Sequence, residues 1–292
     1  MNKMLDSSRI ITYLCSMNKL PISKKVQIIN LLVEGSSLRA ASRIADVSIN
    51  TVTKLLVDVG RACEIFHDEK VKNLKSTKIQ ADEIWSFVGS KEKNTSAENK
   101  EKGYGDIWTW TAIDADSKLI VSWAVGDRTA VTGSQFMNDV AARLANRVQL
   151  TTDGHRAYLE AVYGAFENDI DFAQLQKIYG TPEGTSQTER KYSPAECTGI
   201  KKYTVSGNPD KEHISTSYVE RCNLTMRMGM RRFTRLTNAF SKKVDNHCYA
   251  IALHFVHYNF VRIHKTLRVP PAMEAGLIKR IMTIEDIVRL AD

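Results

Sequence analysis

Three acidic residues stand out in this sequence because carboxylates at such positions can do chemistry: Asp82, Asp153 and Glu220. Asp82 lies in the middle of an apolar stretch, residues 79–88, that has the composition of a buried strand. An unpaired charge there is costly, so such a carboxylate becomes neutral, pairs with a cation or binds a metal. Taken alone, Asp82 could equally cap a loop or pair with a lysine. Carboxylates that converge repel one another, however, and a divalent cation relieves that repulsion.

The elements expected around Asp82 and Asp153 follow a recognisable order. They are strands over 79–88, 106–115 and 118–126, a helix over 132–147, a strand over 148–152, a helix over 155–166 and a strand over 172–179. This order is typical of the ribonuclease H-like fold, an α/β (mixed) fold whose mixed five-stranded sheet has helices on both faces. In that fold the first strand lies beside the fourth, so Asp82 and Asp153 are expected to approach each other.

The third acid, Glu220, is expected on a helix that follows the last of these strands. Val219, Cys222 and Met226 recur at helical spacing, and Phe233 continues this buried stripe. The adjacent face carries Glu220 among amide and cationic side chains: Asn223, Arg227 and Arg231. That setting suits a metal ligand within a phosphate-binding surface. The alternative is a solvated helix acid paired with a neighbouring arginine.

The N-terminal part of the chain has the pattern of a helix-turn-helix. Apolar spacing from Ser23 predicts three short helices, and residues 41–48 resemble the core of that motif. Asp46 stands at the turn position where glycine is usual, and Asp tolerates the left-handed backbone that the turn requires. Ser48 is a suitable N-cap for the third helix. If that helix enters the major groove, the DNA-contact candidates are Asn50, Thr51 and Lys54 for bases and Arg39 and Arg43 for phosphates. An ordinary three-helix packing unit is the alternative.

Composition favours a globular protein with a polyanionic partner. The chain has 292 residues, 43% of them hydrophobic, and 41 basic against 33 acidic residues give a net charge of +8. A membrane span needs about 18 apolar residues in a row, and no stretch of the sequence approaches that length. Charged residues interrupt the start of the chain, which is unlike a signal peptide. We therefore expect a cytoplasmic protein without membrane contact. The five cysteines form no C-x-x-C pair. We therefore expect reduced thiols.

Two further groups of residues admit more than one interpretation. Lys201 and Lys202 lie in a segment, 180–214, that holds three of the six prolines and reads as a long loop. They either contact DNA or belong to a solvated linker. His247, His254 and His257 share one helical face, but no Cys or carboxylate joins them at ligand spacing, so packing or phosphate contact is preferred over zinc.

Several separated segments resemble the acidic motifs of DDE transposases. They are Ala81-Asp82-Glu83-Ile84-Trp85-Ser86, Thr151-Thr152-Asp153-Gly154-His155 and Ser215-Thr216-Ser217-Tyr218-Val219-Glu220-Arg221. The flanking residues 231–243 and 258–267 are similar to the insertion-sequence-one family in particular, and the resemblance spans about residues 38–276. A cysteine cluster that many relatives carry before the helix-turn-helix is missing, which leaves recognition of element ends to the helices.

This resemblance implies a transposase that cuts and joins DNA at insertion-sequence ends, with Asp82, Asp153 and Glu220 as its catalytic and metal-binding triad. Three carboxylates can hold two Mg²⁺ or Mn²⁺ ions, one activating an attacking oxygen and the other stabilising the leaving one. His155 and Asn223 are supporting candidates for positioning phosphate, although His155 could be a plain polar residue at a helix start. Further DNA-contact candidates follow the third acid: Arg227, Arg231, Arg232 and Arg235.

The implied partners are double-stranded DNA, as terminal inverted repeats and target, and at least one further copy of the chain, in a prokaryotic cytoplasm. The expected division is an N-terminal segment 1–22, a helix-turn-helix domain 23–66, a linker 67–78, a ribonuclease H-like domain 79–262 with the insert loop 180–214, and a helical tail 263–292. The alternatives are a silent DNA-binding regulator derived from a transposase, or a nuclease that cuts without joining.

Overall fold

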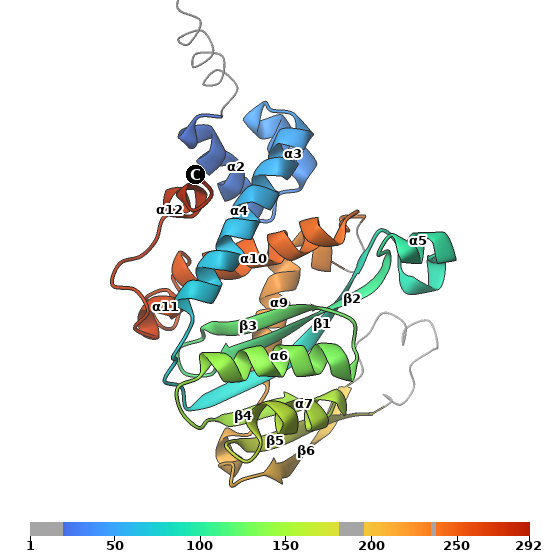
Figure 1. The fold of residues 1–292 in the computed structure, drawn as a ribbon, viewed down its shortest axis with the longest axis vertical. Helices are drawn as coiled ribbons and strands as arrows, with labels where there is room; N and C mark the ends of the chain where they lie inside the picture. The colour runs from blue at the N-terminus through green and yellow to red at the C-terminus, as the bar shows by residue number, and fades with distance from the viewer. Residues whose placement is uncertain (1–19, 181–195, 235–237) are drawn as a thin grey trace, which may run out of the picture.

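The computed structural model describes residues 20–180, 196–234 and 238–292. Its centre is a six-stranded mixed sheet with the strand order β3-β2-β1-β4-β5-β6 (Figure 1). β4 and β5 run parallel to β1, whereas β2, β3 and β6 are antiparallel to their neighbours. The strands are β1 Lys78–Val88, β2 Gly105–Asp114, β3 Ile120–Gly126, β4 Gln149–Asp153, β5 Asp171–Gly180 and β6 Glu196–Ser206. The expected mixed sheet is confirmed, but the expected count of five strands was wrong.

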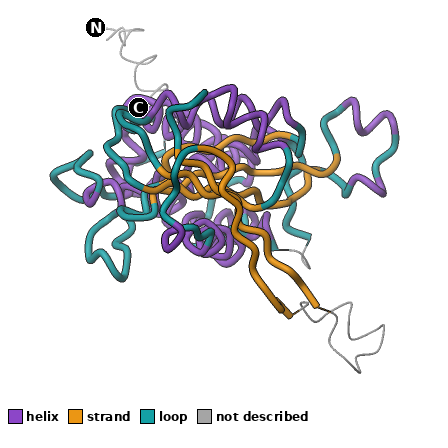
Figure 2. Tube along the Cα trace, turned by 90° about the horizontal axis from the view of Figure 1, so that it is seen from below, coloured by secondary structure: helices purple, strands orange, loops and turns teal. Residues whose placement is uncertain are grey.

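The additional strand comes from the segment that the sequence analysis assigned to a long loop. β6 pairs along β5 from Phe172 opposite Ser206 to Gly180 opposite Glu196. The two strands extend beyond the rest of the sheet as a ribbon (Figure 2). Ile200 and Tyr203 on β6 are 56% and 45% exposed, so the strand lacks the alternation of a half-buried strand. The free edge of β5 supplies backbone partners and makes this segment a strand, which its own side-chain pattern does not predict.

Helices cover both faces of the sheet (Figure 1). On one face lie α6, Ala130–Arg143, and α7, Ala157–Phe166. On the other lie α9, Ser217–Gly229, and α10, Val244–Phe260. The short elements are η1 Glu92–Asn94, α5 Ala97–Glu101, η2 Lys211–His213 and η3 Arg231–Phe233. α6 ends before the predicted residue 147 because Leu144 forms an isolated bridge with Leu74 in extended conformation.

The N-terminal residues form three helices: α2 Ile22–Val33, α3 Leu38–Ala45 and α4 Ile49–Lys70. Ser37 Oγ accepts from the backbone N–H of Ala40 and caps α3, and Ser48 Oγ accepts from that of Asn50 and caps α4. Between them, Asp46 takes the expected left-handed conformation, with φ 51° and ψ 54°. The three helices and the turn between the second and third are therefore present, but the third helix is not short: α4 has 22 residues and extends to Lys70.

The N-terminal helices are continuous with the rest of the core. α4 packs along α10, and Gly60 allows the approach, since a Cβ there would lie 2.4 Å from Tyr249 O. The C-terminal helices, α11 Pro271–Glu274 and α12 Ile284–Arg289, return to this end of the molecule. α12 packs on α2, and Lys25 Nζ pairs with Asp292. Residues 22–70 thus rest on elements from the other end of the chain.

Two expectations from composition concern the whole chain. Among the described residues, no helix combines the length and the apolar character that crossing a membrane requires. Cys63, Cys197, Cys222 and Cys248 are free thiols, and Cys15 lies outside the described residues. Burial raises the pKa of Cys63 strongly and that of Cys222 to about 12, so both thiols are protonated packing residues at neutral pH.

Candidate active site

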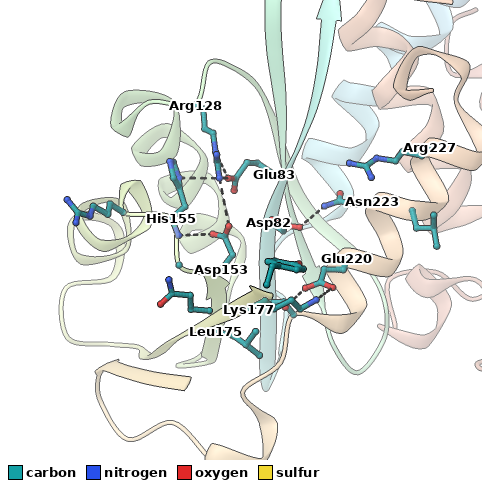
Figure 3. A pocket seen from close by; sticks show the side chains of 16 residues that line it. Asp82, Glu83, Arg128, Asp153, His155, Leu175, Lys177, Glu220, Asn223 and Arg227 are labelled. Atoms are coloured by element: carbon teal, nitrogen blue, oxygen red, sulfur yellow. Dashed lines mark hydrogen bonds and ion pairs between the residues drawn. The ribbon is translucent and has the colours of Figure 1, made fainter. Parts of the chain in front are cut away.

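A cleft of about 820 Å³ opens where the parallel part of the sheet ends (Figure 3). β1 and β4 pair only as far as Ala81 opposite Thr152, whereas β1 continues to Val88. Between Ala81 and Val88, which forms an isolated bridge with Ser241, this edge of β1 has no strand beside it within the described residues, so side chains from both faces of β1 reach the opening. The cleft is lined by Asp82, Glu83, Arg128, Asp153, Gly154, His155, Arg156, Leu175, Gln176, Lys177, Tyr179, Thr216, Glu220, Asn223, Leu224 and Arg227.

Asp82 comes from the middle of β1 and points toward α9. Asn223 Nδ2 donates a hydrogen bond to Asp82 Oδ2 at 2.8 Å. Burial, and after it the carboxylates of Glu83, Asp153 and Glu220, together raise the pKa of Asp82 from 3.8 to about 7. At neutral pH this carboxyl group is therefore close to its midpoint, and a bound cation would favour the charged form.

Asp153 is the last residue of β4, and the turn that follows holds it in place. The backbone N–H of His155 donates to Asp153 Oδ1 at 3.0 Å. Gln174 Nε2, from the neighbouring strand β5, donates to Asp153 O at 2.9 Å and to His155 O at 3.3 Å. The Asp153 side chain is 37% exposed and faces the cleft. The strand end and its turn thus present one carboxylate in a fixed direction.

Glu220 lies in the first turn of α9 on the opposite wall of the cleft. Thr216 Oγ1 donates to Glu220 Oε1 at 2.6 Å, and Lys177 Nζ, from β5, forms an ion pair with Glu220 Oε2. Two hydrogen bonds from the backbone N–H groups of Tyr218 and Val219 to Gln80 Oε1, at 2.8 and 3.2 Å, fix the start of this helix to β1. Glu220 therefore shares the cleft with Asp82 and Asp153, but a lysine occupies one of its oxygens.

Glu83, which the sequence analysis did not single out, is the most buried acid of the site. Its side chain is 1% exposed on the α7 face of β1. Arg128 Nε donates to Glu83 Oε1 at 2.7 Å, and Tyr158 OH donates to Glu83 Oε2 at 3.0 Å. Burial raises the pKa of Glu83, as does Asp153, while Arg128 lowers it. With Arg128 on one oxygen and the Tyr158 hydroxyl on the other, this buried carboxylate is a fully partnered charge.

The remaining predicted residues of the cleft differ in how they are held. His155 Nδ1 is buried without a hydrogen bond and lies 3.9 Å from Glu83 Oε1. Burial and then Arg128 lower the pKa of His155, with Asp153 acting against them, so the imidazole is neutral at neutral pH. Asn223 Oδ1 is also buried without a hydrogen bond. Arg227 lies beside Asn223 on the α9 wall (Figure 3).

The donor set fits a hard divalent cation. Asp82, Glu83 and Asp153 each offer a carboxylate oxygen, and these atoms lie within 4.8 Å of one another. Carboxylate oxygens are the ligands that Mg²⁺ and Mn²⁺ prefer in proteins. Asp82 and Asp153 face the cleft, and each uses one carboxylate oxygen to accept a hydrogen bond. Both oxygens of Glu83 already accept hydrogen bonds. Asp82 and Asp153 are thus the residues best placed to hold a cation, with Glu220 across from them.

Of the three histidines of α10, His247 and His254 are buried and His257 is half-buried. His247 Nε2 is 3.1 Å from Ser86 Oγ, and burial followed by Arg232 lowers the pKa of His247 to about 3. Burial lowers the pKa of His254 to about 3 and that of His257 to about 4. Among the described residues the one group with metal-ligand spacing is Asp82, Glu83 and Asp153. These histidines are neutral packing residues.

The DNA-contact candidates are spread over two regions. Arg39, Arg43, Asn50 and Lys54 are exposed on α3 and α4, and Thr51 is half-buried. On β6, Lys201 and Lys202 are exposed, and Lys202 Nζ donates to Lys211 O at 2.9 Å.

The arginines after α9 have different surroundings. Arg231 is exposed, whereas Arg232 is half-buried and its Nη1 donates to Ser241 Oγ at 2.9 Å and Asn246 O at 2.6 Å. Burial lowers the pKa of Arg232 to about 10. Arg235 lies outside the described residues. The guanidinium of Arg232 is therefore engaged in hydrogen bonds within the protein.

Sequence reasoning missed Glu83, Arg128 and Lys177. Alternation along β1 puts Glu83 on the face opposite Asp82, and only the early end of β4 lets both reach one cleft. Arg128 follows β3 by two residues and carries no spacing signal. Lys177 lies on β5, and its ion pair with Glu220 depends on how β5 and α9 pack against each other, which no local sequence pattern shows. A second acid directly after Asp82 was the one available hint.

Comparison with known proteins gives weak structural likeness alone. No family model matches the sequence, and no curated protein matches it. Solved structures similar to the chain include a piggyBac transposase synaptic complex with hairpin DNA, at 9% identity and a TM-score of 0.40, covering 92% of this chain and 69% of that one. They also include a Mos1 transposase paired-end complex with the left transposon end, at 12% identity and a TM-score of 0.22, covering 59% and 68%.

A Mos1 strand transfer complex is similar at 12% identity and a TM-score of 0.24, covering 87% of this chain and 85% of that one. Scores at this level identify neither a fold nor a function.

Proposed function

We propose that this protein is a DDE-type transposase with a ribonuclease H-like catalytic domain, similar to the insertion-sequence-one family, that cuts and joins DNA at insertion-sequence ends. The observation that carries the proposal is the cleft where three acids from three separate elements, Asp82 on β1, Asp153 at the end of β4 and Glu220 on α9, face one opening beside cationic side chains. A phosphodiester is the substrate class that such a combination of carboxylates and cations suits.

The acids and their partners divide the work at the reacting phosphate. When bound by these carboxylates, Mg²⁺ or Mn²⁺ ions supply the positive charge that activates an attacking oxygen and stabilises a leaving one. Asn223 fixes the Asp82 carboxylate through its hydrogen bond to Oδ2, and the His155 N–H fixes Asp153. Thr216 orients Glu220. The neutral imidazole of His155 is available to accept or donate a proton near the phosphate.

DNA is the proposed macromolecular partner. The net charge of +8 favours a polyanion. The exposed side chains of Arg39, Arg43, Asn50 and Lys54 on α3 and α4 suit contact with a terminal inverted repeat, with α4 in the role of a recognition helix. Arg227 in the cleft and Lys201 on β6 suit contact with the strand that is cut. Joining of two ends would require at least a dimer.

The test is a cleavage and joining reaction. The protein is incubated with a labelled duplex from the end of the element that encodes it, a target plasmid and Mg²⁺, and then again as the Asp153→Ala variant. We expect cut ends and joined products from the wild type. The variant should bind the duplex but neither cut nor join it, since the charge that it loses faces the reacting phosphate.

Each other outcome points to a different class of protein. Binding without cutting by the wild type would favour a DNA-binding regulator. Cutting without joined product would favour a nuclease. Full activity of Asp153→Ala would contradict the role proposed for this acid. A conservative Asp153→Asn variant controls for loss of shape at the end of β4.

A further inference from the structure

The pair of Glu83 and Arg128 is more elaborate than core packing requires. A residue on the inner face of β1 could be apolar, yet position 83 holds a carboxylate that is 1% exposed. Arg128 Nε and Nη2 lie 2.7 and 2.6 Å from Glu83 Oε1, and Tyr158 OH holds Oε2. Burying an ion pair adds little to stability compared with apolar packing. What such a pair does instead is hold the guanidinium of Arg128 in one place.

The backbone around Arg128 is fixed as well. Asp127 O accepts from Trp110 Nε1 at 3.0 Å, and Trp110 is fully buried. The Asp127 carboxylate accepts from Thr129 Oγ1 at 2.6 Å and from Thr132 Oγ1, which ties the segment to the start of α6. The Arg128 guanidinium also lies over the Trp108 ring, 4.7 Å from its centroid. Arg128 is therefore held by its main chain, its ion pair and an aromatic ring.

The other edge of the guanidinium faces the cleft. The Arg128 side chain is 40% exposed, and its Nη2 lies 3.9 Å from Asp153 Oδ2, beyond hydrogen-bond distance (Figure 3). Among the described residues, Nη1 has no hydrogen-bond partner. A planar guanidinium with one edge anchored and the other open matches the oxygens of a phosphate group. It stands on the wall opposite Asn223 and Arg227.

We propose that Arg128 binds the phosphate at which the DNA strand is cut, and that Glu83 is the positioning residue that holds its guanidinium. This inference rests on the proposed function. Arg128 lies beside Asp153. A phosphate that reaches a cation bound by the acids would therefore also be within reach of the open edge of the Arg128 guanidinium. The fixed positive charge meets the negative charge that develops on the phosphate oxygens, without reorganisation during the reaction.

The competing interpretation is that Glu83 is a metal ligand. Its oxygen lies within 4.8 Å of the oxygens offered by Asp82 and Asp153. Glu83 Oε1, however, already contacts two nitrogens of Arg128, and Oε2 accepts from Tyr158, so a bound cation would compete with these partners. The two interpretations differ in what Glu83→Gln does to metal binding, and this difference needs no catalytic assay.

The experiment compares two forms of the element-end duplex under single-turnover conditions. One has the native phosphate at the position that the wild-type protein cuts, and the other has a neutral methylphosphonate there. Arg128→Ala should slow cutting of the native duplex by about 100-fold. Most of this penalty should disappear on the methylphosphonate, because the charge that Arg128 contacts is already gone. Arg156→Ala is the matched control, since Arg156 is an exposed cation of the same cleft without an ion pair among the described contacts.

Two results would overturn the inference. An equal loss in Arg156→Ala would mean that general positive charge suffices, and an unchanged Arg128→Ala penalty on the methylphosphonate would mean that Arg128 does not touch that phosphate. Arg128→Ala leaves a buried carboxylate unpaired and could unfold the chain. Arg128→Lys, which keeps the charge, and the double variant Glu83→Gln with Arg128→Gln, which removes both charges, keep the test valid. Both should lose most of the rate while remaining folded.

Measurements of metal binding and of DNA binding distinguish a failure of this inference from a failure of the proposed function. Glu83→Gln should bind Mn²⁺ as the wild type does, whereas Asp82→Asn should lose Mn²⁺; an equal loss in both would make Glu83 a ligand and contradict the inference. A wild type that cuts no DNA in Mg²⁺ or Mn²⁺ would sink the proposed function. Arg128 is tested even then by duplex binding in EDTA, where Arg128→Ala must weaken binding more than Arg156→Ala does.

Discussion

Replacing Asp82 by asparagine should make the metal-free protein more stable at pH 8, although it should destroy the metal site. The folded state raises the pKa of Asp82 from 3.8 to about 7, first through burial and then through the neighbouring carboxylates. The folded state therefore holds this proton more tightly than the unfolded chain does. Stability falls as the pH rises from about 4 to about 7, where the unfolded chain releases the proton before the folded one.

The size of the effect follows from the shift. About three pKa units at about 1.4 kcal/mol per unit give an upper bound of about 4 kcal/mol for the charge at Asp82. Water penetration into the open cleft reduces this, so we expect a gain of about 2 to 4 kcal/mol for Asp82→Asn at pH 8. Asparagine keeps the shape and can still accept the hydrogen bond from Asn223. At pH 4 the gain should nearly vanish, because the folded state keeps Asp82 neutral and the unfolded chain is then close to its own pKa of 3.8 and only partly ionised.

Urea unfolding in EDTA, followed by tryptophan fluorescence at pH 4, 6 and 8, measures this gain. Asp286→Asn is a control of opposite sign. Hydrogen bonds from Arg280 and the Thr283 backbone hold the pKa of Asp286 well below its usual range, so its replacement should destabilise the protein at pH 8. An Asp82→Asn variant that is no more stable than the wild type at pH 8, or whose gain is the same at pH 4, would refute the reasoning.

Three further predictions concern the cleft and its surroundings. Mg²⁺ should raise the midpoint of thermal unfolding more at pH 8 than at pH 6, since protons compete for the same carboxylates; equal shifts at both pH values would contradict this. Lys177→Met should raise Mn²⁺ affinity up to about fivefold, measured by titration, because the exposed ion pair that competes for Glu220 is worth at most about 1 kcal/mol. Lys201→Ala combined with Lys202→Ala should reduce the slope of log affinity for DNA against log salt by about 2, whereas an unchanged slope would place β6 away from DNA.

Local features of the fold could be predicted from the sequence because they depend on neighbouring residues. Ser37 and Ser48 cap helices through hydrogen bonds three and two residues away, and Asp46 makes the turn by its own backbone preference. The position of Asp153 follows in the same way from a short strand that ends in Asp-Gly. The buried face of α9 follows from helical spacing, with Val219, Cys222 and Met226 all buried.

Features that depend on distant parts of the chain could not be predicted. β6 forms because the edge of β5 is free, which the side chains of residues 196–206 do not reveal. Glu83 joins the cleft because β4 stops at Asp153 while β1 continues, so alternation along one strand gave an incomplete account of the site. The ion pairs of Arg128 and Lys177 span 45 and 43 residues. No local pattern predicts such contacts.

The central claim is that Asp82, Asp153 and Glu220 hold divalent cations in one cleft, and iron-mediated cleavage of the chain tests it most directly. Fe²⁺ replaces Mg²⁺ at such oxygen sites, and with ascorbate and peroxide it cuts the backbone beside the bound ion. We predict three cuts, near residues 82, 153 and 220, that added Mg²⁺ suppresses and Asp82→Asn abolishes. Cuts confined to the histidines of α10, or a pattern that Asp82→Asn leaves unchanged, would contradict the claim.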